Sequence, residues 1–192
     1  FKVSDWSQEE ANEGFHASIR NCWKSGNPIS CCRAAIGSED KTVVILDLST
    51  PGSMRQVARL SGLGSSIESR PCELPGLLVT LDVNPGVLRV WRQSDWSCVK
   101  NWQAHSTGGC FALCGVQRVS GSWVVVSGSE GELKEWDVES GSCVSTMSLP
   151  PEVRSVISRG DGRHVVSCCG FDDKLRLWDV DAPGSCVRVM SG

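Results

Sequence analysis

The sequence predicts an all-β protein built from repeated antiparallel sheets of four strands. A short apolar run carrying Trp or Leu crosses a polar turn and ends on Ser followed by a sulfur-containing residue, and this stretch occurs four times. The Trp or Leu positions are 46, 91, 136 and 178, and the sulfur positions are 54, 98, 143 and 186, so both keep steps of 42 to 45 residues. A period of about 40–45 residues with strands and turns is typical of propeller-like blades.

The period divides the chain into four units whose apolar strands alternate with turns of Gly, Pro, Asn, Asp or Ser. We expect residues 1–14 to be the remnant of a preceding blade, and the units to lie at about 15–60, 61–104, 105–149 and 150–192. In the first two units we expect strands at 17–23, 29–36, 42–46, 54–60, 77–81 and 87–91, followed by an outer strand that carries Trp102. In the last two we expect them at 110–116, 123–127, 133–138, 143–149, 153–158, 164–169, 174–180 and 186–190.

Composition excludes several classes of partner. The 19 basic and 22 acidic residues form no run of like charge, which argues against nucleic acid or an anionic membrane surface as the main partner. No apolar run approaches the roughly 20 residues of a membrane span, so a soluble protein is expected. The opening residues Phe1-Lys2-Val3 fit no signal peptide, and we expect the chain to begin inside a longer protein.

The eleven cysteines are interpreted as structural thiols. Their number is odd, and many lie within apolar strands or at one repeat position, which is typical of small buried hydrophobes. Cys110-x₃-Cys114 is the nearest approach to a zinc spacing and does not match Cys-x₂-Cys. The sequence therefore predicts no metal and no cofactor, and it favours a reducing intracellular compartment, cytoplasmic or nuclear. The thiols at the repeat position are Cys98, Cys143 and Cys186.

Several residues recur at fixed places in the units. The third unit has His105, Ser127-Gly128-Ser129, Trp136 and Asp137; the fourth has Ser167, Asp172, Trp178 and Asp179. The first has His16, Asp40, Thr42 and Asp47, and the second keeps only Trp91. On these residues nearly the whole chain resembles the WD40 repeat family, with four repeats and an N-terminal remnant.

The resemblance implies a hydrogen-bond chain of His, Asp, Ser and the Trp indole in each blade. His105, Ser127 and Trp136 would form such a set. No unit shows all four members, because Glu130 stands where Asp is expected in the third and the fourth lacks the His. Packing of each Trp should outweigh the missing bonds, at roughly 4–6 kcal/mol against about 1 kcal/mol per bond. The expected structural residues are His16, Asp40, Trp91, His105, Ser127, Trp136, Asp137, Asp172, Trp178 and Asp179.

The resemblance also implies that four units are an incomplete ring, since WD40 propellers commonly have about seven blades. Blades bury their faces against neighbours, so an open arc leaves apolar faces for the remaining blades of the same propeller or for another subunit.

The function expected is a non-catalytic scaffold that binds a protein or peptide within a larger complex. No catalytic constellation can be assembled, and His164 after a turn is expected to be solvated. WD40 domains often grip ligands on the loop face, where the candidate binding residues are Arg20, Lys41, Glu130, Arg154 and Phe171. The alternative that these residues lie in solvated loops and have no specific role also remains open. For Trp96 and Trp102, docking and packing against a neighbouring blade both remain open.

Two other functions stay open. One is the substrate receptor of a ubiquitin ligase, although Glu139 and Asp181 occupy the Arg place of the Trp-Asp-x-Arg motif found in one receptor class. The other is a non-catalytic propeller appendage of a larger enzyme, whose catalytic residues would lie outside this stretch.

Overall fold

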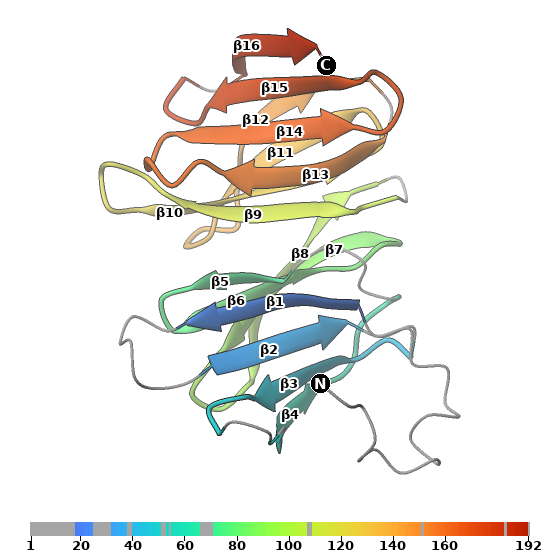
Figure 1. The fold of residues 1–192 in the computed structure, drawn as a ribbon, viewed down its shortest axis with the longest axis vertical. Helices are drawn as coiled ribbons and strands as arrows, with labels where there is room; N and C mark the ends of the chain where they lie inside the picture. Colours follow the sequence, from blue (N-terminus) through green and yellow to red (C-terminus); the bar gives the residue numbers. More distant parts are fainter. Residues whose placement is uncertain are drawn as a thin grey trace. The chain divides into compact units, whose positions relative to one another are not determined.

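The structure is a computed structural model that describes residues 18–24, 32–37, 40–50, 53, 55–65, 71–106, 109–150, 152–182 and 184–191. These residues form sixteen strands and no helix, so the prediction of an all-β chain is confirmed. The strands pair in chain order into four antiparallel sheets of four strands each (Figure 1). The described part of the chain therefore contains no helix that could cross a membrane.

The sheets belong to two compact units, residues 1–68 and 69–192, which we describe separately. The first unit holds the first sheet: β1 (Ser18–Lys24), β2 (Cys32–Gly37), β3 (Val43–Asp47) and β4 (Arg55–Leu60). The second unit begins with the second sheet: β5 (Cys72–Leu74), β6 (Leu77–Leu81), β7 (Gly86–Arg92) and β8 (Cys98–His105). The third sheet is β9 (Ala112–Gln117), β10 (Trp123–Ser129), β11 (Glu132–Asp137) and β12 (Cys143–Ser148). The fourth is β13 (Val153–Ser158), β14 (His164–Cys169), β15 (Lys174–Asp179) and β16 (Ser185–Ser191).

Most strands lie within two residues of the predicted bounds, but β5 was not predicted. It has three residues, and Pro75 and Gly76 turn the chain directly after it, with Gly76 at a φ of 70°. So short a segment carries no readable alternation of apolar and polar residues.

A β-bulge occurs at the same place in every sheet, between the third and fourth strands. The third-strand Trp or Leu is paired with one fourth-strand residue, and the next fourth-strand residue is an unpaired Val. The paired residues are Trp91–Cys98, Trp136–Cys143, Trp178–Cys186 and Leu46–Gln56, and the inserted residues are Val99, Val144, Val187 and Val57. The repeated sulfur position therefore marks the bulge. In the first sheet Gln56 is paired with Leu46, and Met54, which the period places here, lies outside the described residues.

The prediction that the thiols at the repeated position are buried was wrong. Cys98, Cys143 and Cys186 are exposed, because the fourth strand is the outer edge of each sheet. Each Sγ lies instead against the backbone carbonyl oxygen two residues further on, at 3.4, 3.3 and 3.6 Å respectively. Cys110 and Cys169, in predicted apolar strands, are buried as expected, whereas Cys114 and Cys168 are half-buried.

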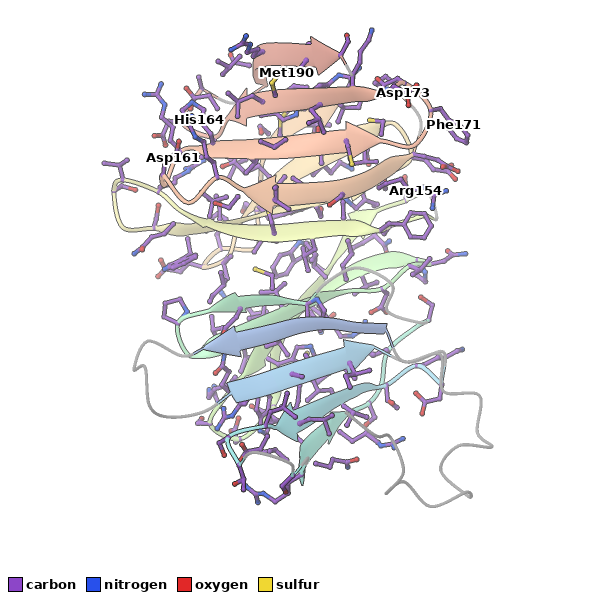
Figure 2. All side chains as sticks on the ribbon, in the orientation of Figure 1. Arg154, Asp161, His164, Phe171, Asp173 and Met190 are labelled. Atoms are coloured by element: carbon purple, nitrogen blue, oxygen red, sulfur yellow. The ribbon has the colours of Figure 1, made fainter. Side chains whose placement is uncertain are left out.

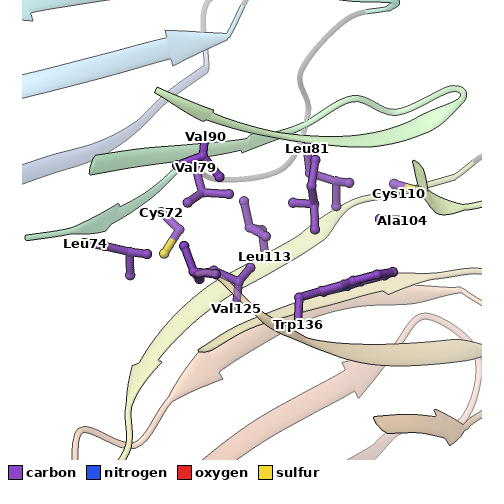
Figure 3. Packing of buried hydrophobic residues seen from close by; sticks show 12 residues of the cluster. Cys72, Leu74, Val79, Leu81, Val90, Ala104, Cys110, Leu113, Val125 and Trp136 are labelled. Carbon is purple, nitrogen blue, oxygen red and sulfur yellow. The ribbon is translucent and has the colours of Figure 1, made fainter. Parts of the chain in front are cut away.

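The core of the second unit lies on both faces of the third sheet. Side chains alternate along β10, so Val125 packs toward the second sheet while Val124 and Val126 pack toward the fourth. Trp136 belongs to the cluster shared with the second sheet (Figure 3), and Trp178 belongs to the cluster shared with the third. The inner strand β9 packs beside both β5 and β13. This stacking is consistent with propeller-like blades.

A buried ion pair lies within the third sheet at the end where β9 turns into β10, and its arginine also bonds to the fourth sheet. The Arg118 guanidinium contacts the Glu135 carboxylate and donates to the Val180 carbonyl oxygen at 3.1 Å. Ser145 donates to the other Glu135 oxygen at 3.2 Å. Glu135 is 1% exposed, and burial raises its pKa despite the neighbouring Arg118. The pair is therefore a desolvated polar contact in an otherwise apolar interface.

The first sheet carries its own small cluster. Ala34, Ile36, Val44 and Leu46 share one face and are all buried, with Leu48 packed beside them. Leu46 thus occupies the buried third-strand place that Trp holds in the other three sheets, as the repeat predicted.

Candidate functional site

Each sheet of the second unit fixes its Trp by the same hydrogen bond. The indole Nε1 of Trp136 donates to Ser127 Oγ at 2.9 Å, and that of Trp178 donates to Ser167 Oγ at 2.9 Å. Trp91 donates to Thr80 Oγ1 at 3.0 Å. All three hydroxyls are at most 1% exposed. The second repeat, at about 61–104, therefore keeps the hydroxyl partner Thr80 as well as Trp91. Thr80 was missed because only Ser was sought at this place.

In the third sheet the hydrogen bonds continue from Ser127 to a buried histidine. Ser127 Oγ lies 2.7 Å from His105 Nε2, and His105 Nδ1 lies 2.8 Å from Glu132 Oε1. Because Ser127 accepts the indole proton, it donates its own proton to Nε2, and the ring proton then resides on Nδ1 and is donated to Glu132. Burial lowers the pKa of His105, which agrees with a neutral ring.

The acid that bonds to His105 is Glu132, not Glu130, which the sequence placed at the position of the expected Asp. Glu130 is exposed at the turn, while Glu132, the first residue of β11, reaches His105 with its longer side chain. Lys134 Nζ also lies 2.9 Å from Glu132 Oε1. Burial raises the pKa of Glu132, but the bonds from Lys134 and His105 outweigh it and lower the pKa overall. Trp136, Ser127, His105 and Glu132 thus form one continuous hydrogen-bonded set in this sheet.

The order Ser, His, Glu has the form of a hydrolytic triad, yet its geometry serves structure. Ser127 and His105 are both fully buried, and the Ser127 oxygen already accepts the indole proton of Trp136. A nucleophile must reach the substrate and be free to attack. This set therefore ties the connection before β9 to β10 and β11.

The second and fourth sheets also pair an acid with a cation, as Glu132 and Lys134 do in the third. Asp82 pairs with Arg89, and Asp172 pairs with Arg176. Each cation lies two residues before the Trp of its strand, where Lys134 stands in the third sheet. The bond from Arg176 is the main cause that lowers the pKa of Asp172. The sequence shows these three cations at one repeat position, but it does not show which acid each of them contacts.

The remaining predicted structural acids organise turns. Asp137 Oδ1 accepts from the Ser140 backbone N–H and from Ser140 Oγ, both at 2.7 Å, which lowers the pKa of Asp137. Asp179 Oδ2 accepts from Arg163 Nη2 at 2.6 Å. Asp40 accepts from the Thr42 backbone N–H at 3.0 Å and from Thr42 Oγ1 at 2.6 Å. His16 lies outside the described residues.

His164 is not simply solvated, contrary to the expectation. Its Nδ1 lies 2.7 Å from Asp161 Oδ2, and its side chain is 20% exposed. Trp102 packs against Trp136 with ring centroids 6.0 Å apart, so of the two alternatives for Trp102 the structure shows packing. Trp96 lies in the turn after β7 at a φ of 58°.

Three of the five candidate binding residues lie at the same loop end of the second unit. Phe171 is 75% exposed in the turn between β14 and β15, and the Arg154 side chain is 49% exposed at the start of β13. Figure 2 shows both at the end opposite Asp161 and His164. Glu130 is exposed in the turn between β10 and β11. Lys41 belongs to the other unit, and the side chain of Arg20 in β1 falls outside what the structure describes.

Two residues that sequence reasoning missed lie beside Arg154 and Glu130. The Arg154 guanidinium lies 4.9 Å from the centroid of the Phe111 ring and donates from Nη2 to Glu152 Oε2 at 2.5 Å. A Cβ on Gly109 would lie 3.2 Å from Glu130 Cγ and 3.4 Å from Phe111 Cε2, so Glu130 and Phe111 are close neighbours. Phe111 and Glu152 each directly precede an inner strand, which is the positional signal that could have found them.

We call this set the loop cluster: Phe111, Glu130, Glu152, Arg154 and Phe171. Its close contacts hold Arg154 between an aromatic ring and a carboxylate, so the guanidinium is oriented before any partner arrives. Gly170 allows this approach, since a Cβ there would lie 3.0 Å from Glu152 Oε2. The arrangement offers an apolar ring, a fixed cation and an acid side by side.

No protein-family model matches the chain, and no curated protein matches it. Among the described residues, no three or more His, Cys, Asp or Glu side chains are grouped to hold a metal ion.

Proposed function

We propose that this chain is a non-catalytic WD40-type scaffold that binds a protein or peptide through the loop cluster. The observation that carries the proposal is the Arg154 guanidinium fixed on Phe111 and Glu152, at the loop end where the Phe171 ring is exposed (Figure 2). Aromatic and Arg side chains held rigidly at a surface are typical centres of protein interfaces. Orienting Arg154 in advance lowers the entropy lost on binding.

Three features support the WD40 part of the proposal. The second, third and fourth sheets each bond a Trp indole to a buried hydroxyl on the neighbouring strand. The third also carries the His and acid that the family pattern implies. The inner strands β5, β9 and β13 are neighbours, as successive blades of one propeller would be.

The experiment is an affinity capture from native extract with quantitative mass spectrometry, using the whole chain as bait. Phe171→Ala and Arg154→Glu should each reduce recovery of the same proteins at least tenfold. Val119→Ala and Arg159→Glu are matched controls, because these residues are exposed by 80% and 60% in turns at the opposite end of the strands. Both controls should capture what the wild type captures.

Purified binding partners then give the affinity. A tenfold loss corresponds to about 1.4 kcal/mol, a small demand for a central interface residue. If Arg154→Glu recovers the same proteins as the wild type, or if the controls lose them equally, binding through the loop cluster is wrong.

A further inference from the structure

Three aspartates occupy one position of the repeat and share one kind of hydrogen bond. Asp47, Asp137 and Asp179 directly follow the third-strand Leu or Trp of the first, third and fourth sheets. In each of them Oδ1 accepts a backbone N–H of the following turn, at 2.9, 2.7 and 2.9 Å respectively. This position therefore holds the turn after the third strand in all three sheets.

The second carboxylate oxygen distinguishes Asp137 from the other two. Arg55 Nη2 donates to Asp47 Oδ2 at 3.2 Å. Arg163 donates to Asp179 Oδ2 from Nε at 2.8 Å and from Nη2 at 2.6 Å. In the part of the chain that the structure describes, no side chain donates to Asp137 Oδ2. Asp137 thus lacks the arginine that both of its equivalents bind.

An indole replaces this arginine in the third sheet. Arg163 directly precedes the β14 residue that pairs with Asp179. Trp123 directly precedes the β10 residue that pairs with Asp137, so Trp123 stands at the place of Arg163. Trp123 is half-buried and lines the same pocket as Asp137. An aromatic ring near a carboxylate favours a guanidinium, which stacks on the ring while it donates to the oxygens.

A second arginine of the chain lies at the junction of the third and fourth sheets. Arg118, in the turn between β9 and β10, donates to the Val180 carbonyl oxygen at 3.1 Å. Its Nε lies 3.9 Å from Asp181 Oδ1. The equivalent residues of the third sheet are Val138 and Glu139, which follow the third-strand Trp at the same spacing. The carbonyl group and the acid that meet Arg118 thus recur one sheet earlier.

The turn that carries Arg118 has no counterpart between the second and third sheets. The turn between β5 and β6 consists of residues 75–76, a Pro and a Gly, so it has no long side chain. A pocket of about 450 Å³ lies here instead, and Trp123, Asp137 and Glu139 line it from the third sheet. The apolar residues that line it from the second sheet are Leu77, Val90 and Val99.

Two cations of the second sheet also line the pocket, and each has partners of its own. Arg92 donates to Asp95 Oδ2 at 3.1 Å. Lys100 Nζ contacts the backbone carbonyl oxygen of Glu139, not its carboxylate. Among the described residues, neither Glu139 nor Asp137 forms an ion pair, so two negative charges remain for a ligand.

We propose that this pocket binds an arginine side chain of a partner protein. The guanidinium donates to Asp137 Oδ2 and to the Glu139 carboxylate and stacks on the Trp123 ring, while its aliphatic stem contacts the apolar lining. Arginine fits better than lysine, because a planar guanidinium donates in several directions and stacks, whereas an ammonium is a compact point charge. The pocket lies at the end of β11, whereas Glu130 of the loop cluster precedes that strand, so the proposal does not rest on the loop cluster.

The probe is the capped tripeptide acetyl-alanyl-arginyl-alanine amide, titrated into the ¹⁵N-labelled full chain and followed by NMR. The signals of the Trp123 indole N–H and of the Glu139 backbone amide should shift and reach saturation. The same peptide with citrulline in place of arginine keeps the shape of the side chain without its charge, and it should bind at least about tenfold more weakly. A lysine peptide should bind at least about threefold more weakly.

Substitutions at equivalent positions give the matched control. Asp137→Asn keeps an oxygen for the turn and removes the charge, so it should weaken binding of the arginine peptide at least about tenfold. Asp179→Asn makes the same change where Arg163 already lies, and it should leave the affinity within about twofold of the wild type. Glu139→Gln changes an exposed side chain outside the core and should weaken binding at least about threefold.

The proposal is wrong if the citrulline peptide binds as tightly as the arginine peptide, or if Asp137→Asn and Asp179→Asn bind the arginine peptide alike. Equal affinity for the lysine peptide would identify a general acidic surface and would also overturn the proposal. If Asp137→Asn alters the ¹⁵N spectrum of the free chain as a whole, Glu139→Gln decides, and unchanged binding in that variant would contradict the proposal.

Discussion

Ser127 and Ser167 occupy the same place in consecutive sheets, yet they carry different numbers of hydrogen bonds. Ser127 accepts from Trp136 and donates to His105, whereas Ser167 accepts from Trp178. Replacing Ser127 with Ala leaves a buried N–H donor and a buried imidazole nitrogen unpaired. Replacing Ser167 with Ala leaves one buried donor.

The two substitutions should therefore differ in magnitude. An unsatisfied buried polar group destabilises by about 1–3 kcal/mol. We expect Ser127→Ala to lower the local free energy of opening by about 3 kcal/mol and Ser167→Ala to lower it by about 1.5 kcal/mol. Both side chains are at most 1% exposed, so water cannot replace the missing partner without rearrangement.

Hydrogen–deuterium exchange with peptide resolution measures this directly, because it reports each sheet separately in a chain of two compact units. Peptides from β10 and β11 report Ser127→Ala, and peptides from β14 and β15 report Ser167→Ala. A His105→Gln background should reduce the difference between the two substitutions. Equal losses in both sheets, or an unchanged difference in that background, would refute the hydrogen-bond chain.

Three further predictions test the packing and charge of the second unit. Arg118→Met should destabilise by about 3 kcal/mol in urea denaturation by stranding the Glu135 carboxylate, and adding Glu135→Val should recover most of that loss; an additive double variant would contradict the ion pair. Gly128→Ala should destabilise by about 1–3 kcal/mol, because its Cβ would lie 2.7 Å from Val153 Cγ1, and Val153→Ala should reduce this loss while the 3.0 Å contacts with Ala112 and Val153 Cβ remain; an undiminished loss would argue against the contact. The pKa of His105 is lowered in the folded chain, so the unfolded chain binds more protons below about pH 6.5 and stability should fall as pH decreases from 7.5 to 5.5. His105→Gln should reduce that slope in thermal unfolding, and an unchanged slope would contradict a buried neutral ring.

The sequence predicted the strands well because its signals there are local. Asp161-Gly162 and similar turn residues mark hairpins, and the strands at 153–158, 164–169 and 77–81 lie within the predicted bounds. The period of the Trp residues also predicted four similar sheets. These features depend on neighbouring residues along the chain.

What the sequence did not predict depends on contacts across strands. Spacing placed Cys143 and its equivalents in phase, but their exposure follows from the bulge on an outer strand. Glu132 could not be separated from Glu130 without knowing which of them reaches His105. Phe111 lies far from Arg154 in the sequence and Glu152 lies close to it, so sequence spacing does not single out either residue. The packing of the third and fourth sheets brings all three together.

The central claim is that each sheet of the second unit repeats one device, an indole N–H held by a buried hydroxyl. Exchange of the indole protons followed by ¹⁵N-resolved NMR tests it most directly, with Thr80→Ala, Ser127→Ala and Ser167→Ala assigning the signals. The account predicts slow exchange for Trp91, Trp136 and Trp178, each lost only in the variant that removes its own acceptor. Fast exchange of all three, or protection unaffected by those substitutions, would contradict it.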